Sequence, residues 1–126
     1  GGANIDFSFR RPNFDPKFIL IDMLVFYTTF HFSNQTYEDG LNYLRTNLLP
    51  AIGQHPEFHT LRLQRILHEV EDSNGRSVSM QFCVPDEAAL RCWLEATGDD
   101  LLQAVTKRYG TEVAYFSTLL EELALQ

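Results

Sequence analysis

Apolar residues along this chain change their spacing in a fixed order. From Met23 onward the spacing is two-residue, helical, two-residue, two-residue, helical and two-residue. A two-residue period is typical of strands and a 3.6-residue period is typical of helices, so the order predicts a βαββαβ unit. We therefore expect an α+β, ferredoxin-like fold: a four-stranded antiparallel sheet with two helices on one face.

The predicted strands cover residues 23–32, 60–70, 77–84 and 112–120. In the first, Phe26 and Phe30 fall on one face, and Tyr27 and Thr29 fall on the other. The second strand changes phase after Leu63, which indicates a β-bulge near Gln64-Arg65. The segment 72–75 ends in Asn74-Gly75, a pair that favours a tight hairpin turn before the third strand.

The first predicted helix follows Thr36 and ends or kinks near Leu49, because Pro50 removes a backbone donor. Its buried stripe is Tyr37, Leu41, Leu44, Leu48 and Ile52.

The second predicted helix begins at the N-cap Asp86. Gly98 is expected to end its first segment, Asp99 to cap a second segment, and Gly110 to end that segment. The first segment should bury Leu90, Trp93, Leu94 and Ala96.

Residues 1–22 form a different kind of segment, an N-terminal arm before a single domain at 23–126. Gly1-Gly2 resembles an expression scar, and the following residues combine aromatic side chains with two X-Pro pairs. Two interpretations stay open. The arm is either native and packs on the core or a partner, or it is sequence upstream of a protein that starts at Met23.

Composition narrows the class of function. The chain has 126 residues, is 44% hydrophobic and carries a net charge of −7. This is enough chain for one globular core, and an acidic surface repels phosphate backbones, so we expect no nucleic-acid partner. The longest apolar run, 18–32, is interrupted and too short to span a bilayer, so we expect no membrane partner.

The two cysteines, Cys83 and Cys92, are too few for a disulfide framework, and we expect both to be reduced and half-buried. With no recognisable signal peptide, a cytoplasmic location follows by default.

The sheet face away from the helices has an unusual composition. It is mixed and poor in charge, which is typical of a partly buried interface or an enclosed cavity. We therefore expect a homodimer, a dimeric α+β barrel in which two sheets pack face to face around a modest cavity. The sequence leaves open which face of the last strand takes part. Candidate residues for this dimer or ligand face are Val25, Tyr27, Thr29, His31, Ser79, Gln81, Cys83 and Tyr115.

No motif in the chain carries recognisable chemistry. His55 and His59 have i, i+4 spacing, but Pro56 between them makes a metal-binding helix improbable. A nucleophilic cysteine would need to lie close to His31, and no spacing requires this. We predict no catalytic residue, no metal site and no cofactor.

Five segments, in order, resemble one known family: Met23–Tyr27, Leu48–Pro50, Leu61–Leu63, Ser79–Phe82 and Val113–Glu121. They resemble the small ferredoxin-like proteins of domain-of-unknown-function family 4286, typical of Bacteroidetes. The resemblance covers about residues 23–123 and excludes the arm. It implies the same fold but no established activity.

The resemblance also implies two departures from the family pattern. Asn47 stands where the family has a histidine, and Ser117 stands where it has an arginine, whereas Gln81 matches a polar position. If the histidine and arginine serve a reaction, this chain does not perform it.

These observations favour a non-enzymatic homodimer that acts through protein contacts or binds a small apolar molecule weakly. Two alternatives stay open. One is a cofactor-independent, monooxygenase-like enzyme with a pocket between the sheets, and the other is a regulatory ligand-binding module.

Overall fold

The computed structural model describes residues 23–68 and 74–125, and every structural statement below concerns these residues. The strands and helices follow the predicted order. Their bounds are β1 (Leu24–Ser33), α2 (Tyr37–Tyr43), η1 (Leu44–Leu48), α3 (Leu49–Gly53), β2 (His59–Arg65), β3 (Gly75–Val84), α4 (Glu87–Trp93), η2 (Leu94–Gly98), α5 (Asp99–Tyr109), η3 (Gly110–Glu112) and β4 (Val113–Glu121).

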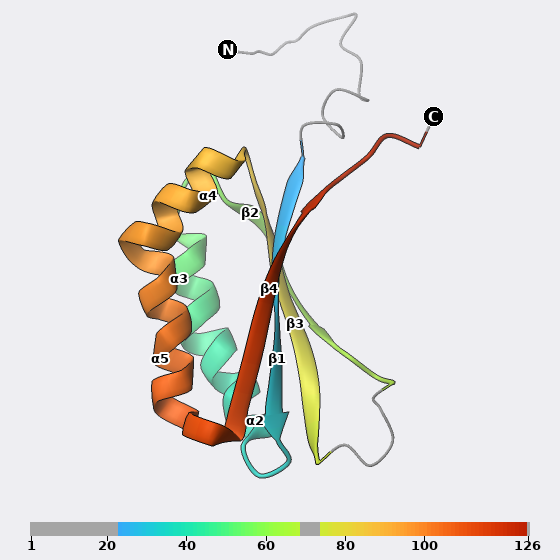
Figure 1. The fold of residues 1–126 in the computed structure, drawn as a ribbon, viewed down its shortest axis with the longest axis vertical. Helices are drawn as coiled ribbons and strands as arrows, with labels where there is room; N and C mark the ends of the chain where they lie inside the picture. Colours follow the sequence, from blue (N-terminus) through green and yellow to red (C-terminus); the bar gives the residue numbers. More distant parts are fainter. Residues whose placement is uncertain (1–22, 69–73, 126) are drawn as a thin grey trace, which may run out of the picture.

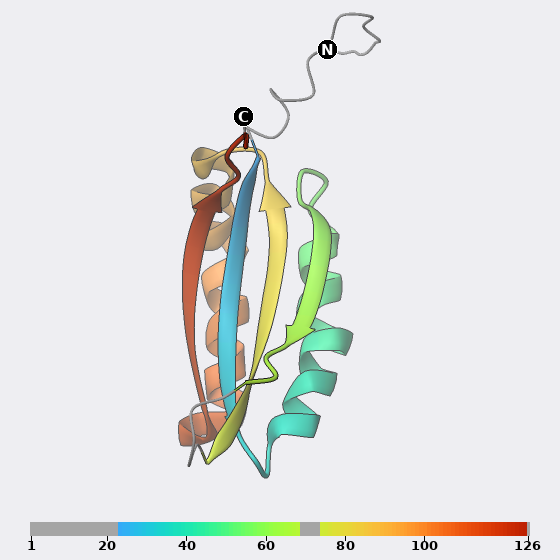
Figure 2. The same ribbon diagram turned by 90° about the vertical axis from the view of Figure 1, so that its right-hand side faces the viewer.

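The four strands form one antiparallel sheet in the order β2-β3-β1-β4. Both helical stretches, α2 to α3 and α4 to α5, lie against the same face of this sheet (Figure 1). The opposite face, turned toward the viewer in Figure 2, is covered by no helix of the described residues. This confirms the predicted ferredoxin-like α+β fold.

The first helix passes through Pro50 without ending near Leu49. A single π-helical turn, η1, ends at Leu48, two residues before the proline, and the Leu49 N–H donates to the Leu44 carbonyl five residues back. The wide turn shifts the hydrogen-bond register next to the residue that cannot donate. The helix then continues to Gly53.

The second helix is also continuous, so the predicted break at Gly98 and the predicted cap at Asp99 were wrong. Gly98 has helical dihedral angles, φ −63° and ψ −42°. A Cβ atom there would overlap the ring of Trp93. Gly98 is therefore needed for the close approach of an aromatic ring.

The predicted ends of this second helix are confirmed. The Asp86 side chain accepts a hydrogen bond from the Ala89 N–H at 2.7 Å, as an N-cap does. At the other end, Gly110 has φ 61°, a conformation that favours glycine.

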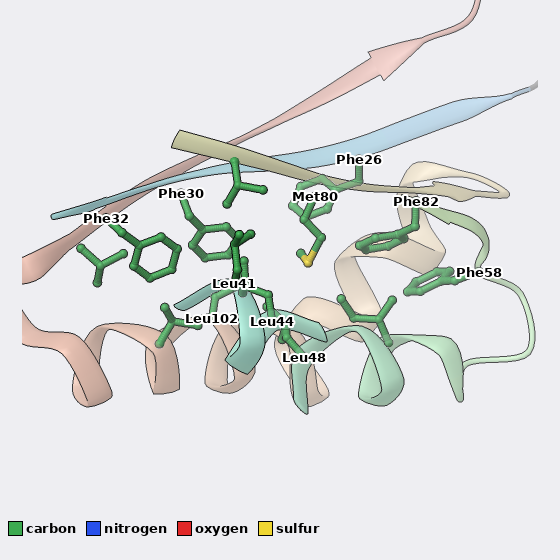
Figure 3. Close-up of a cluster of buried hydrophobic side chains, with 14 of the residues drawn as sticks. Phe26, Phe30, Phe32, Leu41, Leu44, Leu48, Phe58, Met80, Phe82 and Leu102 are labelled. Carbon is green, nitrogen blue, oxygen red and sulfur yellow. The ribbon is translucent and has the colours of Figure 1, made fainter. Parts of the chain in front are cut away.

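The core lies between the sheet and the two helices (Figure 3). Phe26, Phe30, Phe32 and Phe82 come from the strands, and the whole predicted stripe of the first helix is buried, as expected. In the second helix Leu90 and Trp93 are buried, but Ala96 is exposed, contrary to prediction. The cysteines also differ from expectation, because Cys83 is buried and Cys92 is exposed.

Strand β2 is shorter than predicted and irregular at a different place. The register shift lies between His59 and Arg62, not near Gln64-Arg65, and Thr60 within it has a positive φ of 58°. Ile66 lies just after the strand but still donates its N–H to the Ser77 carbonyl, so it continues the alternation of Gln64 and faces away from the side of Leu63.

Some predictions fall outside the described residues. Gly75 is the first residue of β3 rather than a central turn residue, and most of the preceding connection is not described. The arm at 1–22 is not described either. In the described ranges, no helix has both the length and the apolar character that crossing a bilayer requires.

Candidate functional site

The sheet face opposite the helices, called here the open face, is built from four rows of residues that run across the strands. Because directly paired residues in antiparallel strands point to the same side, the register identifies each row. From β2 to β4 the rows are His59, Cys83, Val25 and Leu120; Arg62, Gln81, Tyr27 and Thr118; Gln64, Ser79, Thr29 and Phe116; and Ile66, Ser77, His31 and Ala114.

The structure brings together on this face all of the predicted residues except Tyr115. Tyr115 pairs with Phe30 on the helix-covered side, and their ring centroids are 5.6 Å apart. The placement of Tyr115 on the open face was therefore wrong. Both faces of β4 carry an aromatic residue, so only the pairing register with β1 decides which one is open, and that residue is Phe116.

Large apolar side chains are exposed on the open face. Phe116 is 59% exposed and Leu120 is 46% exposed, both on β4. Val25 and Tyr27, next to them on β1, are half-buried. Val25 pairs with Leu120, and Tyr27 pairs with Thr118 between Leu120 and Phe116, so these apolar residues occupy three neighbouring rows over the β4 half of the sheet.

Charge is scarce on the open face. Arg62 is the one lysine, arginine, aspartate or glutamate in the four rows. Polar side chains there are partly paired with one another: His31 Nδ1 lies 2.8 Å from Ser77 Oγ, and Gln81 Nε2 donates to Gln64 Oε1 at 2.8 Å. These pairs reduce the cost of burying the polar half of the face against another surface.

The geometry limits the chemistry available within one subunit. Cys83 is level with Val25 and His31 lies six residues further along β1, so the two side chains are separated by roughly 20 Å at 3.3 Å per residue. Cys92 is on α4, behind the sheet. Neither cysteine can form a nucleophilic pair with His31.

No metal centre is formed by the described residues, which contain no group of three or more His, Cys, Asp or Glu side chains suited to hold an ion. The open face also lacks a carboxylate within its four rows. Glu112, which lies just before β4, lines one pocket together with His31 beyond the end of these rows.

Sequence reasoning missed several residues of the open face. Phe116 and Leu120 were missed because the sequence leaves open which face of β4 takes part. Arg62 and Gln64 of β2 were missed because the bulge was predicted near Gln64-Arg65, whereas it lies between His59 and Arg62. The only sequence signal for Gln64 is its two-residue spacing from Arg62.

Solved structures resemble this fold at low sequence identity. A protein of the ethyl tert-butyl ether D (EthD) family from Bacillus halodurans aligns with a TM-score of 0.57 and 11% identity, covering 75% of this chain and 96% of that one. SnoaB, a cofactor-independent oxygenase from Streptomyces nogalater, aligns with a TM-score of 0.54 and 20% identity, covering 83% and 95%.

A dimeric ferredoxin-like protein of unknown function from Thermobifida fusca aligns with a TM-score of 0.53 and 12% identity, covering 78% of this chain and 92% of that one. At such identities the likeness establishes the fold alone.

Sequence comparison gives the family. Among curated protein sequences, none matches this chain significantly. The profile of one family matches residues 23–123, which include every described strand and helix and exclude the arm. The chain therefore belongs to the family of the domain of unknown function DUF4286, as its short motifs indicated.

Proposed function

We propose that this chain works as a homodimer in which the open faces of two sheets pack against each other. The observation that carries the proposal is the apolar area made by Phe116, Leu120 and the residues beside them on a face with a single charged residue. Exposed apolar area of this kind is costly in water and marks interaction surfaces.

Two further observations support a second copy of the chain as the partner. Two pairs of polar residues on the face, His31 with Ser77 and Gln81 with Gln64, already bond within the sheet, so a flat partner need not supply hydrogen bonds to these pairs. The Thermobifida fusca protein of the same fold is described as dimeric. A two-fold axis through the open face would place Phe116 of each copy against the partner's sheet.

The dimer has a non-enzymatic role in this proposal, through protein contacts or weak binding of a small apolar molecule between the sheets. The separation of Cys83 from His31 along β1, which rules out a nucleophilic pair within one subunit, supports it. We place the dimer in the cytoplasm, because two separate free thiols suit a reducing compartment.

Light scattering after size-exclusion chromatography tests the dimer. We expect the wild type to elute with twice the 14.5 kDa mass of one chain. Tyr27→Arg and Phe116→Arg should shift it to a monomer at micromolar concentration, with an unchanged helical circular dichroism signal. The matched control is Gln103→Arg, which adds the same charge at an exposed position of α5 and should remain dimeric.

A monomeric wild type, or a Phe116→Arg variant that stays dimeric, would contradict the proposal.

A cofactor-independent oxygenase is the second candidate function. The imidazole of His31 is the observation that favours it, because it lies half-buried on the open face beside Thr29 and could move a proton from an apolar substrate. SnoaB, which has the same fold, is an oxygenase of this type.

Without a cofactor, the electrons that reduce dioxygen must come from the substrate. The test is dioxygen uptake with electron-rich polycyclic phenols. Uptake by the wild type that is lost in His31→Ala, with the dimer intact, would favour the enzyme over the non-enzymatic dimer.

A further inference from the structure

A groove lies on the helix side of the sheet, between the first helix and the edge strand β2. Its volume is about 290 Å³, near the lower end of the range for small-molecule sites. Its lining consists of four aliphatic side chains and two arginines: Leu41, Leu49, Leu63, Val78, Arg45 and Arg65.

Arg65 is held in place by a buried tyrosine. It pairs with Val78 in the β2–β3 ladder and therefore points to the helix side of the sheet. Its Nε donates a hydrogen bond to the Tyr37 hydroxyl at 3.0 Å, and Arg76 covers the ring of Tyr37 at 4.4 Å from its centroid. Tyr37 itself is only 1% exposed, so the guanidinium of Arg65 is attached to a fixed point of the core.

Neither arginine of the groove has an acidic partner within the described ranges. The ion pairs found there join Arg91 to Glu87 and Arg108 to Asp39. Among the described residues, the terminal nitrogens of Arg65 and the whole guanidinium of Arg45 therefore keep their donors for another group. The chain has a net charge of −7, so two arginines without acidic partners beside aliphatic side chains make this groove locally positive.

We propose that this groove binds a small carboxylate with an apolar body, such as a medium-chain fatty acid. The carboxylate would accept hydrogen bonds from Arg65 and Arg45, because a guanidinium matches the planar geometry of a carboxylate. The apolar body would cover the exposed sides of Leu49 and Leu63. Both parts of the ligand then meet a surface of matching chemistry.

The length of the groove fits a ligand of this size. Leu41, Arg45 and Leu49 are spaced four residues apart on one helix, and eight residues at a rise of 1.5 Å extend roughly 12 Å. This is long enough for a short aliphatic chain and too short for an extended peptide of more than about four residues.

The proposal does not depend on the dimer. The groove is on the helix-covered side, whereas the open face is on the other side of the sheet (Figure 1). A failure of either proposal would leave the other intact.

The experiment is a calorimetric titration of the full chain with octanoate, with octanamide and acetate as separate probes. Each probe retains one feature of octanoate: octanamide has the chain without the charge, and acetate has the charge without the chain. We expect octanoate to bind at least tenfold more tightly than either.

Arginine variants locate the site. Arg45→Met retains aliphatic bulk at an exposed position, so it should stay folded and weaken octanoate binding about tenfold. The double variant with Arg65→Met should weaken it further. The control is Arg91→Met on α4, which removes an exposed arginine elsewhere and should leave octanoate binding unchanged.

Three results would overturn the proposal: no heat of octanoate binding, equal binding of octanoate and octanamide, or unchanged octanoate affinity in folded Arg45→Met. Amide chemical shifts on octanoate addition give a second reading. We expect the largest changes along residues 41–49 and 63–65, and changes confined to the open face would refute this location.

Discussion

Tyr109 donates its phenolic proton to Asp39 Oδ2 at a distance of 2.6 Å, which joins the last residue of α5 to the first turn of α2. Arg108 completes the cluster: its Nε donates to the Tyr109 hydroxyl at 3.2 Å, and its Nη2 lies 3.6 Å from Asp39. Asp39 and Arg108 are largely exposed, so their ion pair alone is worth little. The hydroxyl of Tyr109, a residue of the buried core, is the part that ties the two helices together.

Replacing Tyr109 with phenylalanine should lower the free energy of unfolding by about 1 kcal/mol. The change removes the hydrogen bond to the Asp39 carboxylate and the one accepted from Arg108, and keeps the aromatic packing against Phe32. Urea unfolding at pH 7 measures it. The control is Tyr43→Phe, because the Tyr43 ring packs edge-on to Tyr109 but its hydroxyl makes no hydrogen bond within the described residues. Equal losses in the two variants would refute the special role of Tyr109.

The same tyrosine should make stability depend on alkaline pH. Burial, and then the hydrogen bond to Asp39, raise the pKa of Tyr109 above its ordinary value of 10.0. The folded state therefore holds this proton more tightly than the unfolded state does. The resulting stabilisation is present in full below pH 10.0 and is lost as the pH rises through the higher pKa of the folded protein.

Urea unfolding of the wild type and Tyr109→Phe across the alkaline range checks this. The difference in unfolding free energy between the two proteins should shrink above pH 10.0. A difference that stays constant would show that Tyr109 does not titrate in this way.

Gly98→Ala should destabilise the protein by about 1–2 kcal/mol, although alanine is the better helix former. An added methyl group would overlap the Trp93 ring, and such overpacking costs more than the gain in helix propensity of up to about 1 kcal/mol. Thermal unfolding followed by the fluorescence of Trp93 measures the loss.

Gly53→Ala is the matched control. A Cβ at Gly53 would lie 3.5 Å from Leu61, an ordinary van der Waals contact. This variant should keep or slightly raise the melting temperature. If Gly98→Ala behaved in the same way, Trp93 would have to be able to move away.

Periodicity predicted the architecture because each strand and each helix buries one face against the core. The stripe from Tyr37 to Ile52 and the alternation from Phe26 to Phe32 are signals that a sequence carries locally, and both are confirmed. Gly98 misled the prediction, because a glycine that ends a helix and a glycine that admits a neighbouring ring look identical in sequence. Only the position of Trp93 distinguishes them.

The candidate site depends more strongly on pairing. Tyr115 and Phe116 are adjacent aromatic residues on β4, and a shift of one residue in register would exchange them between core and open face. The register is fixed by Phe30 opposite Tyr115, a contact between segments that lie far apart in the chain. The groove of Arg45 and Arg65 was missed for the same reason, because its two arginines come from a helix and a strand that only the fold brings together.

Removing residues 1–22 should leave a folded protein with a melting temperature within about 4 °C of the full chain, a change of about 1 kcal/mol or less. The physical reason is that the buried core within residues 24–113 is supplied by the sheet and the two helices, and the family match begins at Met23. Thermal unfolding by circular dichroism checks it. Global unfolding of the truncated chain would show that the arm belongs to the core.

The truncation also distinguishes two ways of covering the open face. If a second copy covers Phe116 and Leu120, the truncated chain should remain dimeric and bind no more of a hydrophobic dye such as ANS than the full chain does. If the arm covers them instead, its removal should expose this apolar area and raise the dye fluorescence several-fold at the same protein concentration. That increase, together with a monomeric full chain, would show that the arm, and not a second copy of the chain, covers the open face.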